Sequence, residues 1–137
     1  MDDPASVQKI CSAKYPNIRF KIGTRFSYRY PNTVTLGPLE PHYSLLALHE
    51  LGHALCKHQN FSTHVERLKI EREAWDKARA LAPEFGIKFD NDFAEAQLDT
   101  YRDWLHTKSK CKKCGLTRYQ TDDGHYHCPH CDNLSMD

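Results

Sequence analysis

The spacing of apolar residues changes near the start of the chain. Over residues 4–15 they recur at helical intervals, and Asp3 and Pro4 are residue types that suit a helix cap and a first helical position. Between residues 18 and 36 they alternate with polar residues in three short runs that turn-forming residues separate. This pattern predicts a first helix followed by three short antiparallel strands.

Helical spacing returns after the alternating segment and continues over three longer stretches. These stretches are residues 40–58, 64–82 and 92–107, each bounded by residues that cap or break a helix. Thr63 and Glu66 have the spacing of a capping box at the start of a helix. The pattern therefore predicts three further helices after the strands.

The length of the chain limits how many domains these elements can form. With 137 residues, of which 39% are hydrophobic, the chain can build one main core and one small module. We expect an α+β domain over residues 1–107, in which a short antiparallel sheet packs on the helix of residues 40–58 and on further helices. Residues 108–137 are the predicted C-terminal module.

Charge and hydropathy exclude several classes of partner. The 19 Lys and Arg residues nearly balance the 18 Asp and Glu residues, so a polyelectrolyte partner for the whole chain is not expected. No segment reaches the ~18 consecutive apolar residues of a membrane span, and the acidic start of the chain is unlike a signal peptide. We therefore expect a cytoplasmic protein without a membrane partner.

The first candidate site is the HELGH sequence of residues 49–53. On a helix, the four-residue spacing places His49 and His53 on one face, close enough to bind one zinc ion. Glu50 lies next to them, where a carboxylate can take a proton from zinc-bound water. The apolar residues around this motif predict a buried helix, and buried histidines need partners. We therefore predict a catalytic zinc site here.

A catalytic zinc ion usually has three protein ligands, so a third residue is needed. Glu71 falls in the middle of the apolar face of the next helix, whereas Glu73 falls on its charged face. A carboxylate in an apolar stripe is costly unless it is paired or binds a metal. We therefore expect Glu71 to be the third ligand. The alternatives are a salt bridge between Glu71 and Arg67, or His58 or His64 as the ligand.

These residues resemble a known family of enzymes. The segment HELGHAL, residues 49–55, followed by EREAW, residues 71–75, resembles the gluzincin metallopeptidases, and within them the ImmA/IrrE-like metallopeptidases. The segment NTVTL, residues 32–36, is similar to the strand that borders the cleft in that family. The resemblance covers about residues 17–82 and implies a zincin-like domain.

The resemblance also implies a role for each residue of the motif. It implies that His49, His53 and Glu71 bind zinc and that Glu50 is the general base. A substrate peptide would then add as a strand to the edge formed by residues 34–36. The implied activity is zinc-dependent hydrolysis of peptide bonds.

One position departs from the family pattern. Trp75 stands where many relatives have Asn or Asp to steady a histidine, and Asp99 or Asp103 is the candidate replacement. The residue that stabilises the oxyanion is not evident from a motif, and Tyr101 and His106 are the weak candidates.

The second candidate site comprises two Cys-x-x-Cys pairs. Its residues are Cys111, Cys114, Cys128 and Cys131. Together with the expected cytoplasmic setting, this spacing predicts a zinc ribbon, in which four thiolates hold a structural zinc ion. A segment this short cannot bury enough surface to fold alone, so the metal must supply folding free energy. The alternatives are a redox dithiol, or His127 or His130 in place of one cysteine.

The role of the predicted ribbon is a separate question. Basic residues cluster around its first Cys pair, and Tyr119 and Tyr126 can stack on bases, so a weak nucleic-acid contact is one use. Acidic residues offset most of this charge, which favours a structural or protein-docking use. A zincin followed by a zinc ribbon also resembles the SprT-like proteins, which act on DNA-bound proteins.

These features together predict a zinc metalloendopeptidase with one catalytic and one structural zinc ion and a protein or peptide substrate. The alternative, from another class, is a non-catalytic zinc-binding module that regulates transcription or docks on DNA or on a protein. Glu50 distinguishes the two, because a purely structural site does not need a base.

Overall fold

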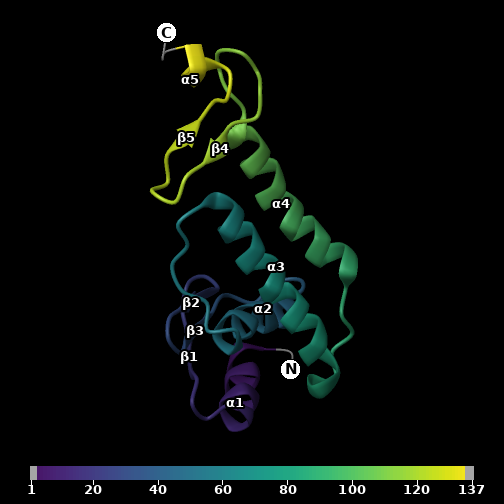
Figure 1. Ribbon diagram of the computed structural model, residues 1–137. Helices are drawn as coiled ribbons and strands as arrows, with labels where there is room; N and C mark the ends of the chain where they lie inside the picture. Colours follow the sequence, from purple (N-terminus) through teal and green to yellow (C-terminus); the bar gives the residue numbers. More distant parts are fainter. Residues whose placement is uncertain (1–2, 135–137) are drawn as a thin grey trace. The chain divides into compact units, whose positions relative to one another are not determined.

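The structure is a computed structural model that describes residues 3–134. Residues 1, 2 and 135–137, at the outer ends of the two predicted domains, lie outside the described part. The elements are α-helices and short β-strands, so the predicted α+β class is confirmed (Figure 1). None of the helices in residues 3–134 is long and apolar enough to span a membrane.

The contacts divide the chain into two compact units. The first unit comprises Met1–Gln59 and Ile70–Asn91, and the second comprises Asn60–Lys69 and Asp92–Asp137. The predicted boundary after residue 107 stays a prediction, because this grouping follows proximity in space and says nothing of which part folds alone.

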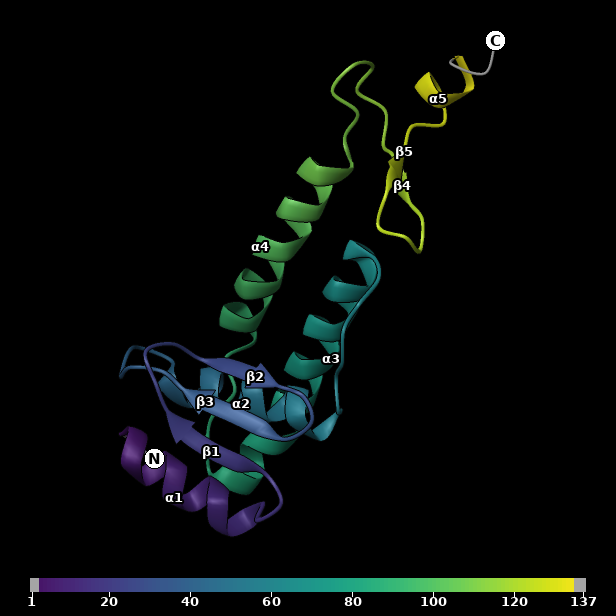
Figure 2. The same cartoon turned by 90° about the vertical axis from the view of Figure 1, so that its left-hand side faces the viewer.

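The first unit begins with helix α1 (Pro4–Lys14), which agrees with the predicted helix. Asp3 caps it, because a side-chain oxygen of Asp3 accepts a 2.8 Å hydrogen bond from the backbone N–H of Ser6. The apolar face of α1 buries Val7 and Cys11 completely or almost completely. The helix lies along the first strand of the sheet (Figure 2).

The sheet has the three predicted strands but not the predicted pairing. The strands are β1 (Arg19–Ile22), β2 (Ser27–Arg29) and β3 (Thr33–Leu36), and their order is β1-β3-β2. Strand β3 is antiparallel to β2 and parallel to β1, so the predicted all-antiparallel sheet is wrong. The sheet is mixed because β3 enters between the two strands that precede it in the chain.

A close backbone approach explains how β3 reaches the centre of the sheet. The N–H of Gly23 donates a 2.8 Å hydrogen bond to the carbonyl of Leu36, so the turn after β1 closes over the end of β3. A Cβ at Gly23 would lie 2.7 Å from Thr35 Cγ2, so a larger residue would require that side chain to shift. The chain then crosses to the other side of β3 before it forms β2.

This order also corrects the predicted substrate edge. Residues 34–36 belong to the central strand, whose two sides pair with β1 and β2. A peptide therefore has no free edge there, and the edges of this sheet are β1 and β2. The inward residues of the sheet, Phe20, Val34 and Leu36, form part of the core.

Helix α2 (Tyr43–Leu55) packs against β2 and β3 and carries the HELGH residues (Figure 2). It is shorter at both ends than predicted. At the start, His42 has a left-handed φ of 65°, and at the end the helix stops before Cys56. Ten of its residues are buried, which is unusual for a surface helix and fits a helix at the centre of a unit.

Helix α3 (His64–Leu81) passes close to α2, and its residues contribute to both units. A Cβ at Gly52 would overlap the backbone carbonyl oxygen of Ala74, so only glycine permits this approach of the two helices.

The predicted capping box is present in part. Thr63 Oγ1 accepts a 3.2 Å hydrogen bond from the N–H of Glu66, whose carboxylate bonds the N–H of Ser62.

The short 3-10 helix η1 (Ala82–Phe85) follows α3, and helix α4 (Asn91–Ser109) then runs through the second unit. The guanidinium of Arg67, which lies near the start of α3, packs over the aromatic rings of Phe61, Tyr101 and Trp104 at 5.2–5.7 Å. These rings and Arg67 all belong to the second unit.

The C-terminal part of the second unit is a small hairpin with a short final helix. Strands β4 (Tyr119–Gln120) and β5 (Tyr126–His127) pair in antiparallel fashion, and α5 (Cys131–Leu134) follows. The turn between the two strands contains Gly124, which has a φ of 86° that glycine adopts without strain.

Candidate metal centres

Three buried side chains of the first unit converge on one point. His49 and His53 come from α2, and Glu71 comes from α3. Glu71 Oε2 lies 2.8 Å from His53 Nε2 and 3.4 Å from His49 Nε2, and each residue is only 8% exposed. One ligand atom from each residue lies within 4.8 Å of the others. The structure thus brings together the three residues that the sequence predicts as zinc ligands.

The hydrogen bonding of this triad tests whether it fits a metal ion. His49 Nε2 is buried without a hydrogen bond, and buried Glu71 Oε2, although it lies 2.8 Å from His53 Nε2, has no hydrogen bond with acceptable geometry. Two buried polar atoms that face each other without a bond are costly, unless a ligand between them satisfies both. Two imidazole nitrogens and one carboxylate oxygen suit zinc, with one position left for water. The residues therefore fit a zinc ion.

The charges in the triad interact strongly when no metal separates them. Burial disfavours a charged His49, but the carboxylates of Glu50 and Glu71 outweigh it and raise the pKa of His49 to about 9. Burial likewise opposes ionisation of Glu71, yet the imidazoles of His49 and His53 lower its pKa below the usual value. The triad is thus an ionic cluster, in which a bound cation can take the place of a proton.

The carboxylate of Glu50 lies beside the triad. Its Oε1 is 3.6 Å from His49 Nδ1, on the ring edge away from the nitrogen that faces Glu71. Glu50 is 9% exposed and is not a member of the group of converging ligand atoms. The residue therefore neighbours the candidate metal site without belonging to its ligand set.

Aromatic rings hold both imidazoles in place. The ring of His49 stacks on Trp75 at 4.4 Å between centroids, with an angle of 11° between the planes. The ring of His53 stacks on Tyr28 of β2 at 5.7 Å, also at 11°. Trp75 therefore steadies a histidine by packing, at the position where the family pattern has a hydrogen-bonding residue.

A hydrogen-bonded pair that the sequence analysis did not predict supports His53. His53 Nδ1 lies 2.9 Å from His58 Nδ1, and His58 Nε2 lies 3.1 Å from Glu73 Oε2. His58 is therefore a neighbour of a candidate ligand. Of the supports proposed for a histidine, Asp99 accepts a hydrogen bond from Arg102 in the second unit.

The alternatives to Glu71 as a ligand find other partners. Arg67 packs over aromatic rings of the second unit, and the ion pairs of Glu71 among the described residues are with His49 and His53. The Nδ1 of His64 lies 2.7 Å from the hydroxyl of Tyr126. Among the described residues, Glu71 thus forms no salt bridge with Arg67, and His64 is not part of the triad.

The four cysteines of the second unit form a second cluster. Cys111 Sγ lies 3.9 Å from Cys131 Sγ, and Cys114 Sγ lies 3.5 Å from Cys128 Sγ. All four sulfur atoms lie within 4.8 Å of one another, and all four thiols are free of disulfides. Four converging sulfurs are the donor set of a structural zinc site, so these residues also fit a zinc ion.

The four cysteines differ in how readily they form thiolates. The backbone N–H groups of Cys114 and Lys113 lower the pKa of Cys111 to about 6. Burial and the neighbouring thiols raise the pKa of Cys131 to about 12, because four thiolates repel one another without a cation. His127 bonds Asp132 and Thr121, which argues against its use as a ligand in place of a cysteine.

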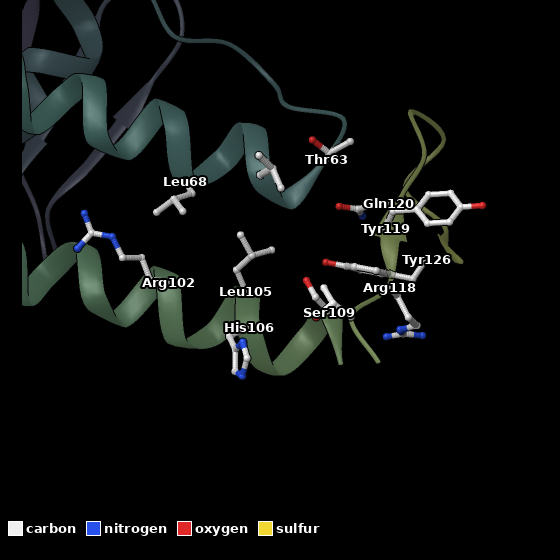
Figure 3. Close-up of a pocket in the computed structure, with 12 residues that line it drawn as sticks. Thr63, Leu68, Arg102, Leu105, His106, Ser109, Arg118, Tyr119, Gln120 and Tyr126 are labelled. Atoms are coloured by element: carbon white, nitrogen blue, oxygen red, sulfur yellow. The ribbon is translucent and has the colours of Figure 1, made fainter. Parts of the chain in front are cut away.

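The second unit also contains a cavity of about 600 Å³ (Figure 3). Leu68 from α3 and Leu105 from α4 point toward each other across it, and the β4–β5 hairpin forms another wall (Figure 3). Its twelve lining residues include Arg102, His106 and Arg118 but no Asp or Glu. The cavity therefore combines an apolar floor with basic side chains in its lining, of which Arg102 forms ion pairs with Glu95 and Asp99.

Comparisons with known proteins add no assignment. No protein-family model, curated protein or solved structure matches the chain. The geometry of the two clusters is therefore the basis for a function.

Proposed function

We propose that the protein is a zinc-dependent metalloendopeptidase of the gluzincin type, similar to the ImmA/IrrE-like metallopeptidases. The observation that carries this proposal is the buried triad of His49, His53 and Glu71, with Glu50 next to it. The residues of the HELGH motif and the later Glu stand in the order and with the donor atoms that such enzymes use.

The chemistry would depend on a division of roles in this cluster. Zinc bound by the triad would act as a Lewis acid on the scissile carbonyl and would make a bound water more acidic. Glu50 would take the proton of that water at its carboxylate, because it neighbours the ligand histidines in the HELGH motif but is not a ligand itself. Tyr28 and Trp75 would keep the two imidazoles in orientation through stacking.

The substrate would add as a strand to the free edge of β2. This strand replaces the edge predicted at residues 34–36, which is in the centre of the sheet. Tyr28 of β2 stacks on His53, so a peptide paired with β2 would pass next to the triad. The other edge, β1, is less accessible because Gln8 Nε2 donates a 2.9 Å hydrogen bond to the carbonyl of Phe20.

The four-cysteine cluster would hold a structural zinc ion. In the described residues, the chain around it forms the two-residue strands β4 and β5, an isolated bridge between Lys110 and Thr117 and the short helix α5, which bury little apolar surface. A bound metal would therefore supply much of the free energy that keeps this part folded.

A second candidate function is favoured by the cavity of the second unit. Residues 104–121 contain five Lys and Arg residues and no Asp or Glu, and the cavity beside them has an apolar floor. This combination would suit an acidic protein segment that inserts one apolar side chain. In this case the chain would be a docking module whose metal ions are structural.

The experiment that separates the two candidates is Glu50→Gln, with Glu40→Gln as an exposed control carboxylate. We expect the Glu50 variant to keep its metal and to lose hydrolysis of a peptide library by about 100- to 10,000-fold, because only proton transfer is removed. The control variant should cleave at the wild-type rate. If metal-loaded wild type cleaves nothing, while an acidic peptide binds wild type and the Glu50 variant equally, the docking function is the correct one.

A further inference from the structure

Three side chains in the first unit form a continuous hydrogen-bonded row that leads away from the candidate zinc site. His53 Nδ1 and His58 Nδ1 are 2.9 Å apart, and His58 Nε2 and Glu73 Oε2 are 3.1 Å apart. The side chain of His58 is 9% exposed, while that of Glu73 is 44% exposed. The row therefore begins at a buried ligand atom and ends near solvent.

The atoms in this row permit one arrangement of protons when His53 binds a metal. His53 Nε2 faces Glu71, so the metal takes that nitrogen and the remaining ring proton must be on Nδ1. That N–H donates to His58 Nδ1, which must accept. The proton of a neutral His58 is then on Nε2, where it donates to the carboxylate of Glu73. Each donor thus meets an acceptor along the row.

The end of α2 places His58 in this position. Its backbone N–H bonds the carbonyl of His53, and the N–H of Lys57 bonds the carbonyl of Ala54, which is the pattern of a Schellman motif. Lys57 occupies the left-handed position of that motif with a φ of 54°. The motif turns the chain back so that residue 58 lies against residue 53.

A third contact keeps the segment on the site. The hydroxyl of Tyr28 donates a 2.9 Å hydrogen bond to the carbonyl of His58, while its ring stacks on His53. The same tyrosine therefore touches both histidines of the row. The backbone and the side chain of His58 are each fixed by separate partners, as a positioning residue requires.

We propose that His58 and Glu73 are positioning residues that fix the tautomer and ring orientation of His53 and so strengthen metal binding at the triad. The inference depends on the metal site of the proposed function but not on peptide hydrolysis. Removal of such a partner of a metal ligand typically lowers metal affinity by about 10- to 100-fold.

The test measures zinc affinity at the triad by competition with a chelator, and the four-cysteine cluster of the same chain serves as the internal reference. His58→Phe keeps a ring but no nitrogen, so we expect a 10- to 100-fold loss of affinity. His58→Asn keeps an acceptor near the position of Nδ1, so its loss should be smaller. Glu73→Gln should lose less than His58→Phe, and the exposed Asp76→Asn on the same helix should lose nothing.

The Co(II) form provides a second readout that a general loss of stability does not produce. In His58→Phe and Glu73→Gln, the visible spectrum of Co(II) at the triad should change, while the thiolate bands of the cysteine cluster should not. If His58→Phe is partly destabilised, Glu73→Gln still tests the inference, because Glu73 is a surface residue whose substitution leaves the core intact.

Two outcomes overturn the inference while the proposed function stands. Unchanged triad affinity in His58→Phe shows that the row does not support the metal. An equal loss in Asp76→Asn and Glu73→Gln shows a nonspecific charge effect. If wild type binds no metal at the triad, the proposed function fails together with the inference. If wild type binds metal at the triad but cleaves no peptide, the zinc affinities of the variants still decide whether the inference holds.

Discussion

At the scale of single residues, the thiol of Cys11 shows how burial affects a titratable group. Cys11 is 1% exposed in α1, and burial raises its pKa from 9.0 to about 11. Cys11 belongs to the apolar core together with Val7, so its folded environment favours the neutral thiol over the thiolate.

The raised pKa of Cys11 in the folded chain predicts that the free energy of unfolding depends on pH. Between pH 9 and about 11 the unfolded chain loses the Cys11 proton while the folded chain keeps it, so the free energy of unfolding should fall as pH rises. The contribution is about 2 kcal/mol over that interval, and it should be absent in Cys11→Ala. Urea unfolding of both proteins from pH 8 to 11 measures the difference. Parallel pH curves would contradict the assigned burial effect.

The part of the candidate zinc site that follows from one face of a single helix can be predicted from the sequence. Glu71 was identified because a carboxylate in an apolar stripe needs a strong partner, and its burial is confirmed. The contact between His58 and Glu73 could not be predicted in this way. It depends on a left-handed residue, Lys57, at the end of α2, and no pattern in the sequence marks that conformation.

At the scale of elements, the approach of α2 to α3 decides whether the triad exists. Gly52 lies between the two histidines of the motif, and a Cβ there would overlap the carbonyl oxygen of Ala74. Ala74 is one helical turn from Glu71, so the contact that Gly52 permits also sets the position of the third ligand. The glycine therefore serves helix packing directly beside the metal site.

Gly52→Ala should consequently lose metal at the triad. We expect α3 to shift away, with a loss of about 1–3 kcal/mol in the free energy of unfolding and a marked drop in zinc affinity at the triad. Gly86→Ala is the matched control, because that glycine has a φ of 66° and no atom within 4 Å of the added methyl group. It should cost stability through backbone strain alone, about 1 kcal/mol, and should keep zinc. Calorimetry and chelator competition measure both effects, and retention of zinc by Gly52→Ala would contradict the packing argument.

The sheet shows the limit of prediction for elements. Alternation located all three strands, because the period of two depends only on neighbouring residues. The order β1-β3-β2 depends on how the chain crosses at Gly23, where the turn closes on Leu36 of another strand. Short connections favour hairpins, so local reasoning predicted three consecutive antiparallel strands.

At the scale of the whole molecule, the two candidate metal clusters differ in chemistry and in the unit that contains them. The triad of nitrogen and oxygen donors belongs to the first unit, and the sulfur cluster belongs to the second. The triad lies among the buried residues of α2 and α3, whereas short elements surround the cysteines. Loss of metal should therefore affect the folding of the cysteine cluster more than that of the triad.

The last prediction is that the chain binds two zinc ions, one at each cluster. Elemental analysis of protein purified without a chelator should approach two zinc ions per chain, and Glu71→Gln and Cys128→Ser should each lower the value to about one. The Co(II) forms identify which site is lost, because Glu71→Gln should keep the thiolate bands and Cys128→Ser should lose them. Hydrogen exchange should then increase around the hairpin in the Cys128 variant and remain unchanged in α2, because the metal stabilises only the unit that binds it. A stable value of one in zinc-replete wild type would remove one of the two sites.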